Sequence, residues 1–200
     1  MPILETTMGM MLLWALGGYL LGSIPFGMVI AKAMGLGSLR DIGSGNIGAT
    51  NVLRTGNKKA AAMTLLFDAG KGALIVYLAR AFAAEDAAQI AGLAAFLGHC
   101  FPVWLRFNGG KGVATYFGLL LMLAPLVGVL AGLTWLITAA VGRYSSMAAL
   151  LSATLAPVIA VLLGKGVILY LCIILAAVIF YRHRGNIDRL RQGTETKIGK

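Results

Sequence analysis

Residues 43–54 concentrate the groups that proteins use to bind an anion. The segment reads GSGNIGATNVLR and contains three glycines, two amide side chains, two hydroxyls and one guanidinium. Small residues let backbone N–H groups converge on an anion, so the segment predicts phosphate binding. A flexible connector made of turn residues is the alternative interpretation. The candidate donors and cation are Ser44, Gly45, Asn46 and Arg54.

A second polar segment, residues 98–115, carries a glycine loop directly ahead of an apolar run. The glycine loop consists of Gly109, Gly110, Lys111 and Gly112. It is similar in logic to phosphate loops, in which backbone amides and a lysine surround phosphoryl oxygens, although the spacing GxxxxGK[ST] is absent. A lysine that snorkels to the interface between two membrane spans is the alternative.

A third polar segment covers residues 181–197 and mixes arginines with His183 and Asn186. A histidine can move a proton near neutral pH, and an amide can donate to an oxyanion, so the segment predicts a part in catalysis. Such a basic tail is otherwise typical of an anchor to anionic lipid. His99, near the end of another apolar stretch, is expected to be a packing histidine.

Asp68 and Lys71 interrupt an apolar stretch about one helical turn apart. A single unpaired charge there would cost about 2.5 to 3.5 kcal/mol on insertion scales. We therefore expect an ion pair between residues i and i+3, in preference to a direct contact with substrate.

The elements that position these segments must lie in lipid. Hydrophobic residues make up 59% of the 200 residues and 27 more are glycine, whereas soluble domains reach about 45 to 50% with glycine included. The net charge is +10, yet no polar stretch is long enough to form a nucleic-acid-binding domain, so we expect no nucleic-acid partner. Cys100 and Cys172 form neither a disulfide framework nor a CxxC metal site.

The charge distribution predicts seven transmembrane helices in one domain covering 1–200. The apolar stretch 113–141 is read as two spans that turn at Pro125, because only then do 14 of the 17 basic residues fall on one face. The N-terminus lacks a basic leader and is expected to be a retained span with a kink at Pro25. It lies outside, and the C-terminus lies in the cytoplasm. The motif loops, at about 35–59, 105–112 and 182–200, then all face the cytoplasm; the remaining apolar stretches are 7–31, 60–83, 87–104, 147–163 and 167–181.

These segments resemble a known family, the bacterial acyl-phosphate-dependent glycerol-3-phosphate acyltransferases, or PlsY family. The first segment is similar to its block GSGNxGATNxxR, the second to GHxFPVxLxFxGGKGVAT and the third to HRxNIxRLxxGxExK. Asp68, Lys71 and Gly72 match its DxxKG element. Asn108 departs from the pattern, since a lysine is expected there. Together the four blocks cover roughly a quarter of the chain in the family's order.

The resemblance implies transfer of a fatty acyl group from acyl phosphate to the 1-hydroxyl of glycerol 3-phosphate. The products are lysophosphatidic acid and inorganic phosphate, in the first step of phospholipid synthesis at the cytoplasmic face of the inner membrane. It implies catalytic roles for His183, Asn186 and Ser44, with no metal and no cofactor. Either His183 or the donor's own phosphate takes the proton. Phosphate binding is assigned to Gly45, Asn46, Arg54, Gly109, Gly110, Lys111 and Gly112.

Two other functions are compatible with parts of the pattern. A transporter of an organic phosphate would also need glycine loops and arginines, but its polar groups should lie deep in several spans. An acyl-CoA-using acyltransferase is suggested formally by His183 and Asp188, which spell HxxxxD. On one continuous helix those two side chains would lie about 140° apart, which weakens the match. The sequence leaves acyl chain preference and oligomeric state open.

Overall fold

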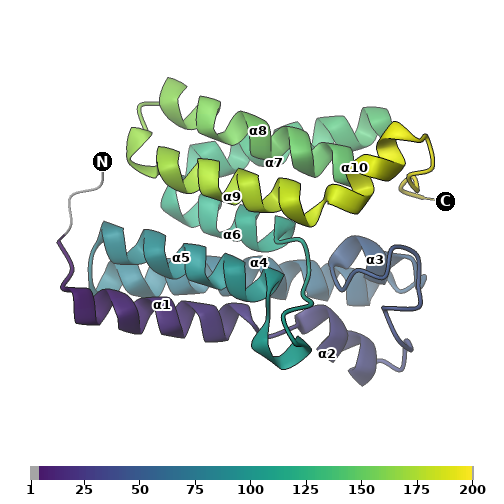
Figure 1. Ribbon diagram of the computed structural model, residues 1–200, viewed down its shortest axis with the longest axis horizontal. Coiled ribbons are helices and arrows are strands. Elements are labelled where there is room, and N and C mark those ends of the chain that lie inside the picture. Colours follow the sequence, from purple (N-terminus) through teal and green to yellow (C-terminus); the bar gives the residue numbers. More distant parts are fainter. Residues whose placement is uncertain (1–4, 200) are drawn as a thin grey trace. The chain divides into compact units, whose positions relative to one another are not determined.

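The computed structural model describes residues 5–199, and this part of the chain contains helices but no strand (Figure 1). The all-helical prediction is confirmed. The α-helices are α1 (Met8–Gly22), α2 (Phe26–Ala33), α3 (Ala49–Leu53), α4 (Lys58–Phe82), α5 (Glu85–Cys100), α6 (Val113–Leu123), α7 (Pro125–Gly142), α8 (Ser145–Leu162), α9 (Leu169–Arg182) and α10 (Arg184–Arg191). Two short 3-10 turns are η1 (Val103–Leu105) and η2 (Gly166–Ile168).

The chain divides into two compact units between Leu119 and Leu120, inside α6. The N-terminal unit (5–119) holds the first two polar segments, and the C-terminal unit (120–199) holds the third. Each unit has its own helical core.

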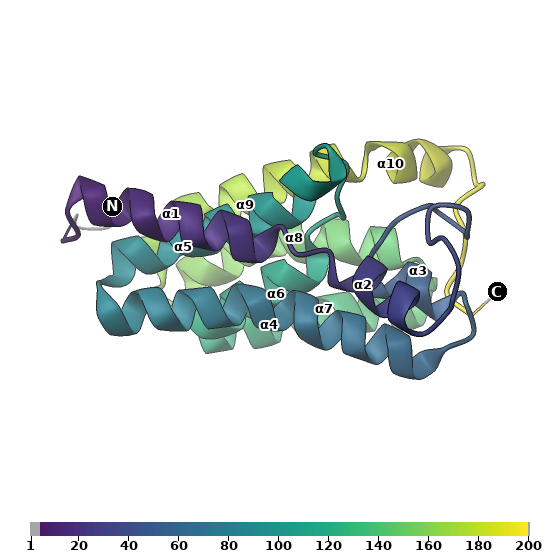
Figure 2. The ribbon, with the colours of Figure 1, turned by 90° about the horizontal axis from the view of Figure 1, so that it is seen from below.

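In the N-terminal unit, α1 lies directly along α5, as Figure 2 shows. Glycines make this approach possible, because a Cβ on Gly18 would collide with the carbonyl of Ala91, and one on Gly22 with the carbonyl of Ala95. Small residues that let helix backbones meet are typical of helix packing in membranes, where lipid offers no hydrophobic drive for association. α4 packs on the same pair of helices.

The predicted kink at Pro25 is a full break. α1 ends at Gly22, and α2 begins at Phe26. Proline lacks an N–H group and disfavours the interior of a helix, so α1 and α2 are separate helices, although together they form one apolar segment, Met8–Ala33, long enough to cross a membrane.

The predicted loop 35–59 is shorter and more structured than expected. It contains the helix α3, and α4 already begins at Lys58. Asn57 caps α4 by accepting a hydrogen bond from the Ala60 N–H at 3.0 Å.

The C-terminal unit is built on α7, α8 and α9. The apolar stretch 113–141 does break at Ala124, with Pro125 as the first residue of α7, as the sequence predicted. Ser152 on α8 donates to the carbonyl of Ala131 on α7 at 2.8 Å, which fixes these two helices in register. The motif loop predicted at about 182–200 contains a helix, because α10 follows α9 after a bend of 62° at His183.

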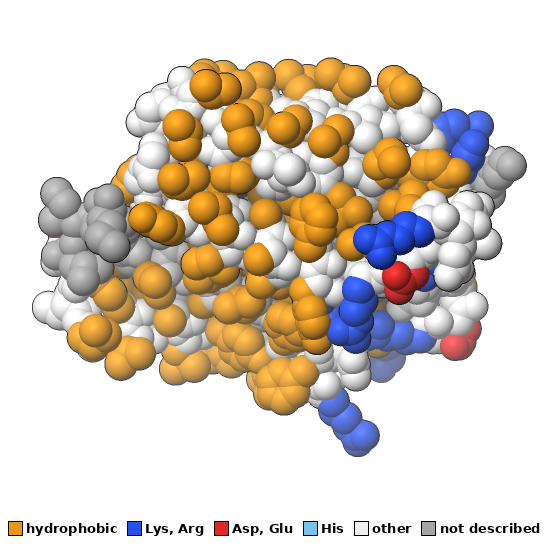
Figure 3. Space-filling model, turned by 45° about the horizontal axis from the view of Figure 1, so that its top comes forward, with side chains coloured by type: hydrophobic (Ala, Val, Ile, Leu, Met, Phe, Trp, Pro, Cys, Tyr) orange, Lys and Arg blue, Asp and Glu red, His pale blue; other side chains and the backbone are white. Residues whose placement is uncertain are grey.

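The surface agrees with a lipid environment. Among the described residues, five helical segments are long and apolar enough to cross a membrane, or six if α9 and α10 count as one bent span. α6 is apolar but shorter. Large hydrophobic side chains such as Leu12, Leu66, Phe82 and Leu162 are exposed, and Figure 3 shows a face on which hydrophobic side chains predominate. The chain is a multi-pass membrane protein.

Candidate active site

Asn51 organises the first polar segment. It is buried on α3, and its Oδ1 accepts hydrogen bonds from the Ser44 N–H at 3.1 Å and the Ser44 hydroxyl at 3.4 Å. Its Nδ2 donates to the carbonyls of Leu39 at 2.9 Å and Asn46 at 2.7 Å. One buried amide therefore satisfies groups from both sides of the loop and fixes its path.

Two arginines add positive charge to this loop. Arg54 is the residue that directly follows α3, about one turn after Asn51, and its Nη1 donates to Asn51 Oδ1 at 3.2 Å. Arg40 donates through Nη1 to the carbonyl of Gly45 at 3.2 Å and through Nη2 to the carbonyl of Asn108. Arg40 thus joins the first polar segment to the second.

The glycine loop folds back on the end of α5. The N–H of Gly109 donates to the carbonyl of Cys100 at 3.2 Å, and the N–H of Gly110 donates to the carbonyl of His99 at 3.0 Å. These bonds satisfy two carbonyls that a helix leaves open at its C-terminus. A Cβ on Gly109 would collide with the His99 carbonyl, and one on Gly110 with the His99 ring, which explains both glycines.

Beyond Gly110 the loop leads into α6. Gly112 has a φ of 82°, and a Cβ there would collide with the ring of Phe96. Its carbonyl accepts the first helical hydrogen bond, from the Tyr116 N–H at 2.7 Å. Lys111 and Gly112 therefore stand at the N-terminus of α6, where a helix favours negative charge.

His183 lies in the C-terminal unit at the bend between α9 and α10. It is 3% exposed, and its Nδ1 lies 2.8 Å from the carbonyl of Ile179. A carbonyl only accepts, so Nδ1 carries the proton and Nε2 carries the lone pair of the neutral ring. This is the tautomer in which Nε2 can act as a base.

A second cluster in the C-terminal unit forms around Glu195. Its Oε1 accepts hydrogen bonds from Asn186 Nδ2 at 2.6 Å and from the Ser146 hydroxyl at 2.8 Å, and its Oε2 accepts from Arg189 Nε at 2.7 Å. Burial by itself raises the pKa of this carboxyl, but the three donors outweigh that effect and hold the pKa below its ordinary range. Glu195 is therefore a carboxylate that fixes the Asn186 side chain.

Comparison with known proteins shows the family to which this chain belongs. Residues 12–193 match the model of the family described as glycerol-3-phosphate acyltransferase. The chain belongs to the glycerol-3-phosphate acyltransferase family. The family predicted from the four sequence blocks is confirmed.

Relatives and solved structures agree over almost the whole chain. Glycerol-3-phosphate acyltransferases of Roseobacter denitrificans and of a Ruegeria species are 62% and 64% identical to it, covering 99% and 100% of this chain and 99% of each relative. The chain is similar to crystal structures of PlsY, described as an integral membrane glycerol 3-phosphate acyltransferase. The glycerol 3-phosphate form gives a TM-score of 0.89 at 40% identity, covering 94% of this chain and 96% of that one. The lysophosphatidic acid form gives a TM-score of 0.86 at 38% identity, covering 94% of this chain and 95% of that one.

For an acyltransferase of this family, the structure distributes the predicted site residues as follows. Ser44, Gly45, Asn46, Arg54 and the glycine loop all lie in the N-terminal unit. His183 and Asn186 lie together at the start of α10 in the C-terminal unit, where the Asn186 N–H donates to the His183 carbonyl at 2.8 Å.

Sequence reasoning gave no role to three residues that the geometry makes central, namely Arg40, Asn51 and Glu195. Arg40 is one of the 14 basic residues that the sequence analysis places on one face of the membrane, and it was given no other role. Asn51 and Glu195 lie within the matched motifs, and this was the signal that could have found them.

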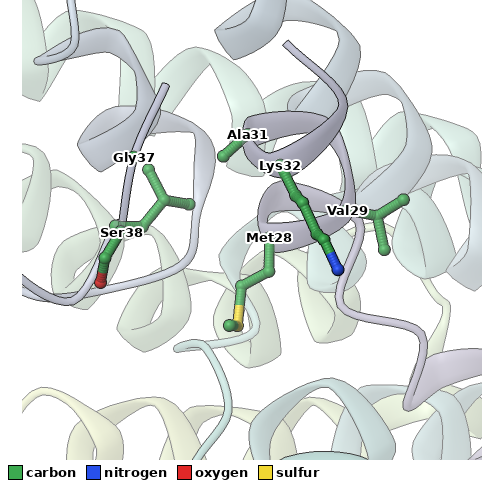
Figure 4. A pocket seen from close by; sticks show the side chains of 7 residues that line it. Met28, Val29, Ala31, Lys32, Gly37 and Ser38 are labelled. Carbon is green, nitrogen blue, oxygen red and sulfur yellow. The ribbon is translucent and has the colours of Figure 1, made fainter. Parts of the chain in front are cut away.

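A separate apolar pocket of about 260 Å³ lies in the N-terminal unit between α2 and the chain that follows it. Figure 4 shows the side chains around it, with Lys32 as the charged one. None of the predicted site residues lines it. The lining residues are Met28, Val29, Ala31, Lys32, Gly37, Ser38 and Leu39.

Proposed function

We propose that the chain transfers the acyl group of an acyl phosphate to the 1-hydroxyl of glycerol 3-phosphate, at the cytoplasmic face of the inner membrane. One observation carries the proposal: Arg40 joins the first polar segment to Asn108, the residue before the glycine loop, so the two predicted anion-binding segments lie side by side. The reaction needs two phosphate groups close together, and their mutual repulsion requires cations and N–H donors on both.

The phosphate groups are held by the N-terminal unit. Arg54 and Lys111 provide positive charge, and the start of α6 provides N–H groups with a favourable dipole. The N–H groups of Gly109 and Gly110 already donate to α5 carbonyls, so these two glycines act by allowing close approach of the backbone. Gly45 contributes in the same way from the first segment, and Asn46 contributes N–H donors from a loop in which Asn51 holds the Asn46 carbonyl.

The chemical step forms one C–O bond and breaks another. The 1-hydroxyl oxygen attacks the acyl carbonyl carbon, and the bond from that carbon to the phosphate oxygen breaks to release inorganic phosphate. The hydroxyl proton goes to Nε2 of His183 or to the departing phosphate. The Nδ1 hydrogen bond to Ile179 supports the first route, because it leaves the lone pair on Nε2.

The carbonyl oxygen gathers negative charge in the transition state and needs donors placed in advance. A positioned donor of this kind is worth about 10²- to 10³-fold in rate. Asn186 is one candidate donor, because Glu195 accepts from its Nδ2 at 2.6 Å and so fixes the orientation of the amide. Ser44 supplies the other, since its long 3.4 Å hydrogen bond to Asn51 is easily exchanged for an oxyanion.

We further propose seven spans, with α6 as a short separate crossing, the N-terminus outside and the C-terminus in the cytoplasm. The break at Ala124 supports this count, because it allows the basic loops to share one face. Reporter fusions at Gly56 and after Lys200 should both report cytoplasm. A periplasmic signal from the second fusion alone would restore six spans.

The function is tested with purified protein in detergent. Palmitoyl phosphate and glycerol 3-phosphate should yield lysophosphatidic acid and one phosphate per turnover, whereas a transporter would release none. Palmitoyl-CoA should give no turnover, because the short cytoplasmic segments leave no folded module for a nucleotide. Comparable turnover with both donors would show that the acyl phosphate assignment is wrong.

A further inference from the structure

A buried polar cluster lies directly behind the glycine loop. It consists of Asp68 and Lys71 on α4 and His99 on α5, each at most 5% exposed. Lys71 Nζ lies 2.9 Å from Asp68 Oδ1, which confirms the predicted ion pair, and Nδ1 of His99 lies 3.5 Å from the same oxygen. The packing histidine of the sequence analysis therefore faces a carboxylate.

Lys71 has a second contact that fixes the cluster in place. Its Nζ donates to the carbonyl of Ile24 at 2.9 Å, at the break between α1 and α2. The same ammonium lies 5.6 Å from the centre of the Phe26 ring. A buried ammonium with these partners keeps the carboxylate of Asp68 at one position.

Asp68 is linked to the chain on both sides of Lys111, through its carboxylate on one side and its backbone carbonyl on the other. On one side, the ring of His99 lies against Gly110, since a Cβ on Gly110 would collide with the ring, and the His99 carbonyl accepts the Gly110 N–H at 3.0 Å. On the other side, the hydroxyl of Thr115 donates to the Asp68 carbonyl at 2.9 Å. Lys111 lies between Gly110 and Thr115, so both of its flanks are tied to one residue of α4.

We propose that Asp68 and His99 are positioning residues for phosphate binding, which hold the glycine loop so that Lys111 and the start of α6 meet the phosphate of a substrate. The inference rests on the proposed function. The chemistry recognised is a phosphate monoester or an acyl phosphate, and the kinetic arms below distinguish these two sources.

The first test neutralises the buried pair while keeping its volume. The double variant Asp68→Asn with Lys71→Met leaves no uncompensated charge, so the helices keep their packing. We expect KM for one phosphorylated substrate to rise roughly tenfold, while kcat changes less than about threefold, because the loop loses its alignment but the reacting groups stay intact. Each KM is measured with the other substrate saturating, and the one that rises names the phosphate bound.

Asp86→Asn is the matched control. Asp86 is also a buried carboxylate of the N-terminal unit, at the other end of α5, where it accepts hydrogen bonds from the N–H and the hydroxyl of Thr6. Its loss should lower the melting temperature and leave both KM values unchanged. An equal KM rise in Asp86→Asn would mean that general destabilisation explains the effect, and the proposal would fall.

A single variant tests the same proposal if the double variant does not fold. His99→Gln fills much of the ring's volume and keeps a polar group, but loses the rigid ring against Gly110. We expect the same selective rise in KM. Unchanged KM values in folded His99→Gln protein overturn the proposal, whereas a wild-type protein that releases no phosphate overturns the proposed function instead.

Discussion

The N-terminal and C-terminal units hold their polar residues by different means. In the N-terminal unit the glycine loop lies where it does because side chains are absent, since a Cβ on Gly109, Gly110 or Gly112 would collide with α5. In the C-terminal unit a side chain that is present, Glu195, gathers donors from α8 and α10. The backbone path of the glycine loop thus depends on space, whereas the placement of Asn186 and Arg189 depends on the charge of Glu195.

In the proposed reaction, the N-terminal unit mainly binds phosphate, and the C-terminal unit mainly supplies side chains for the chemical step. Close backbone approach suits a phosphate, which is recognised by several N–H groups and a cation at once. A proton transfer and an oxyanion need individual side chains in one tautomer and one rotamer, and a carboxylate partner fixes them. Apart from Ser44, which the proposed reaction uses as an oxyanion donor, substitutions in the N-terminal unit should therefore act mainly on KM, and substitutions in the C-terminal unit mainly on kcat.

The sharpest test of the chemical side is His183→Ala. We expect kcat to fall about 10²-fold or more, with little change in KM, if Nε2 takes the hydroxyl proton. Steady-state kinetics on the purified variant measures this. Arg191→Ala, an exposed residue of α10, serves as control and should keep kcat. A loss below about tenfold would favour the donor's phosphate as proton acceptor.

The binding side is tested at Lys111 and Gly110. Lys111→Ala removes a cation and Gly110→Ala forces a methyl group against the His99 ring, so each should raise KM for a phosphorylated substrate by about 10-fold or more. Gly70→Ala is the control, because a Cβ on that α4 glycine meets nothing within 4 Å. Unchanged KM values for both substrates in folded variants would break the assignment.

Glu195→Gln tests whether charge organises the C-terminal unit. The side-chain carbonyl of glutamine can still accept from Asn186, but the partner of Arg189 loses its charge, so kcat should fall about five- to tenfold. The lowered pKa of Glu195 means that its stabilising contribution is present at neutral pH and is lost as pH falls below the ordinary pKa of a glutamate and through the lowered pKa of the folded state.

Thermal unfolding in detergent checks the pH dependence. Wild type should lose roughly 2 to 4 °C of Tm through this group on acidification, and Glu195→Gln should already lack it at pH 7. Asp188→Asn, at an exposed carboxyl of α10, should follow wild type. Identical pH profiles for wild type and Glu195→Gln would show that this carboxylate does not organise the unit.

The sequence predicted the helical architecture well because lipid imposes simple rules. Long apolar stretches must be helices, Pro25 and Pro125 stand at breaks between helices, and Asp68 and Lys71 must pair. The motif segments were found because glycine, amide and guanidinium groups stand out in an apolar chain. These features depend on residue type and local spacing alone.

What the sequence could not provide were contacts between segments far apart in the chain. Nothing local shows that Arg40 reaches Asn108, or that His99 faces Asp68 across two helices. The helices α3 and α10 were missed because they have only five and eight residues, too few for a helical period to stand out in the sequence. Such short helices form through tertiary contacts instead of intrinsic propensity.

The smallest effect is expected at Arg40, which joins two loops that other contacts already hold. Arg40 is exposed, and it donates to the backbone carbonyls of Gly45 and Asn108. Each such hydrogen bond is worth about 0.5 to 1.5 kcal/mol net, and solvent competes here, so Arg40→Ala should raise KM only about two- to fivefold. Arg40→Lys keeps the charge but cannot bridge both carbonyls as a fork, so it should resemble alanine if bridging matters and wild type if charge alone matters. A loss of 10²-fold or more in Arg40→Ala would instead make this guanidinium a direct ligand of substrate phosphate, and the division between steric and charge-based control would no longer hold for the N-terminal unit.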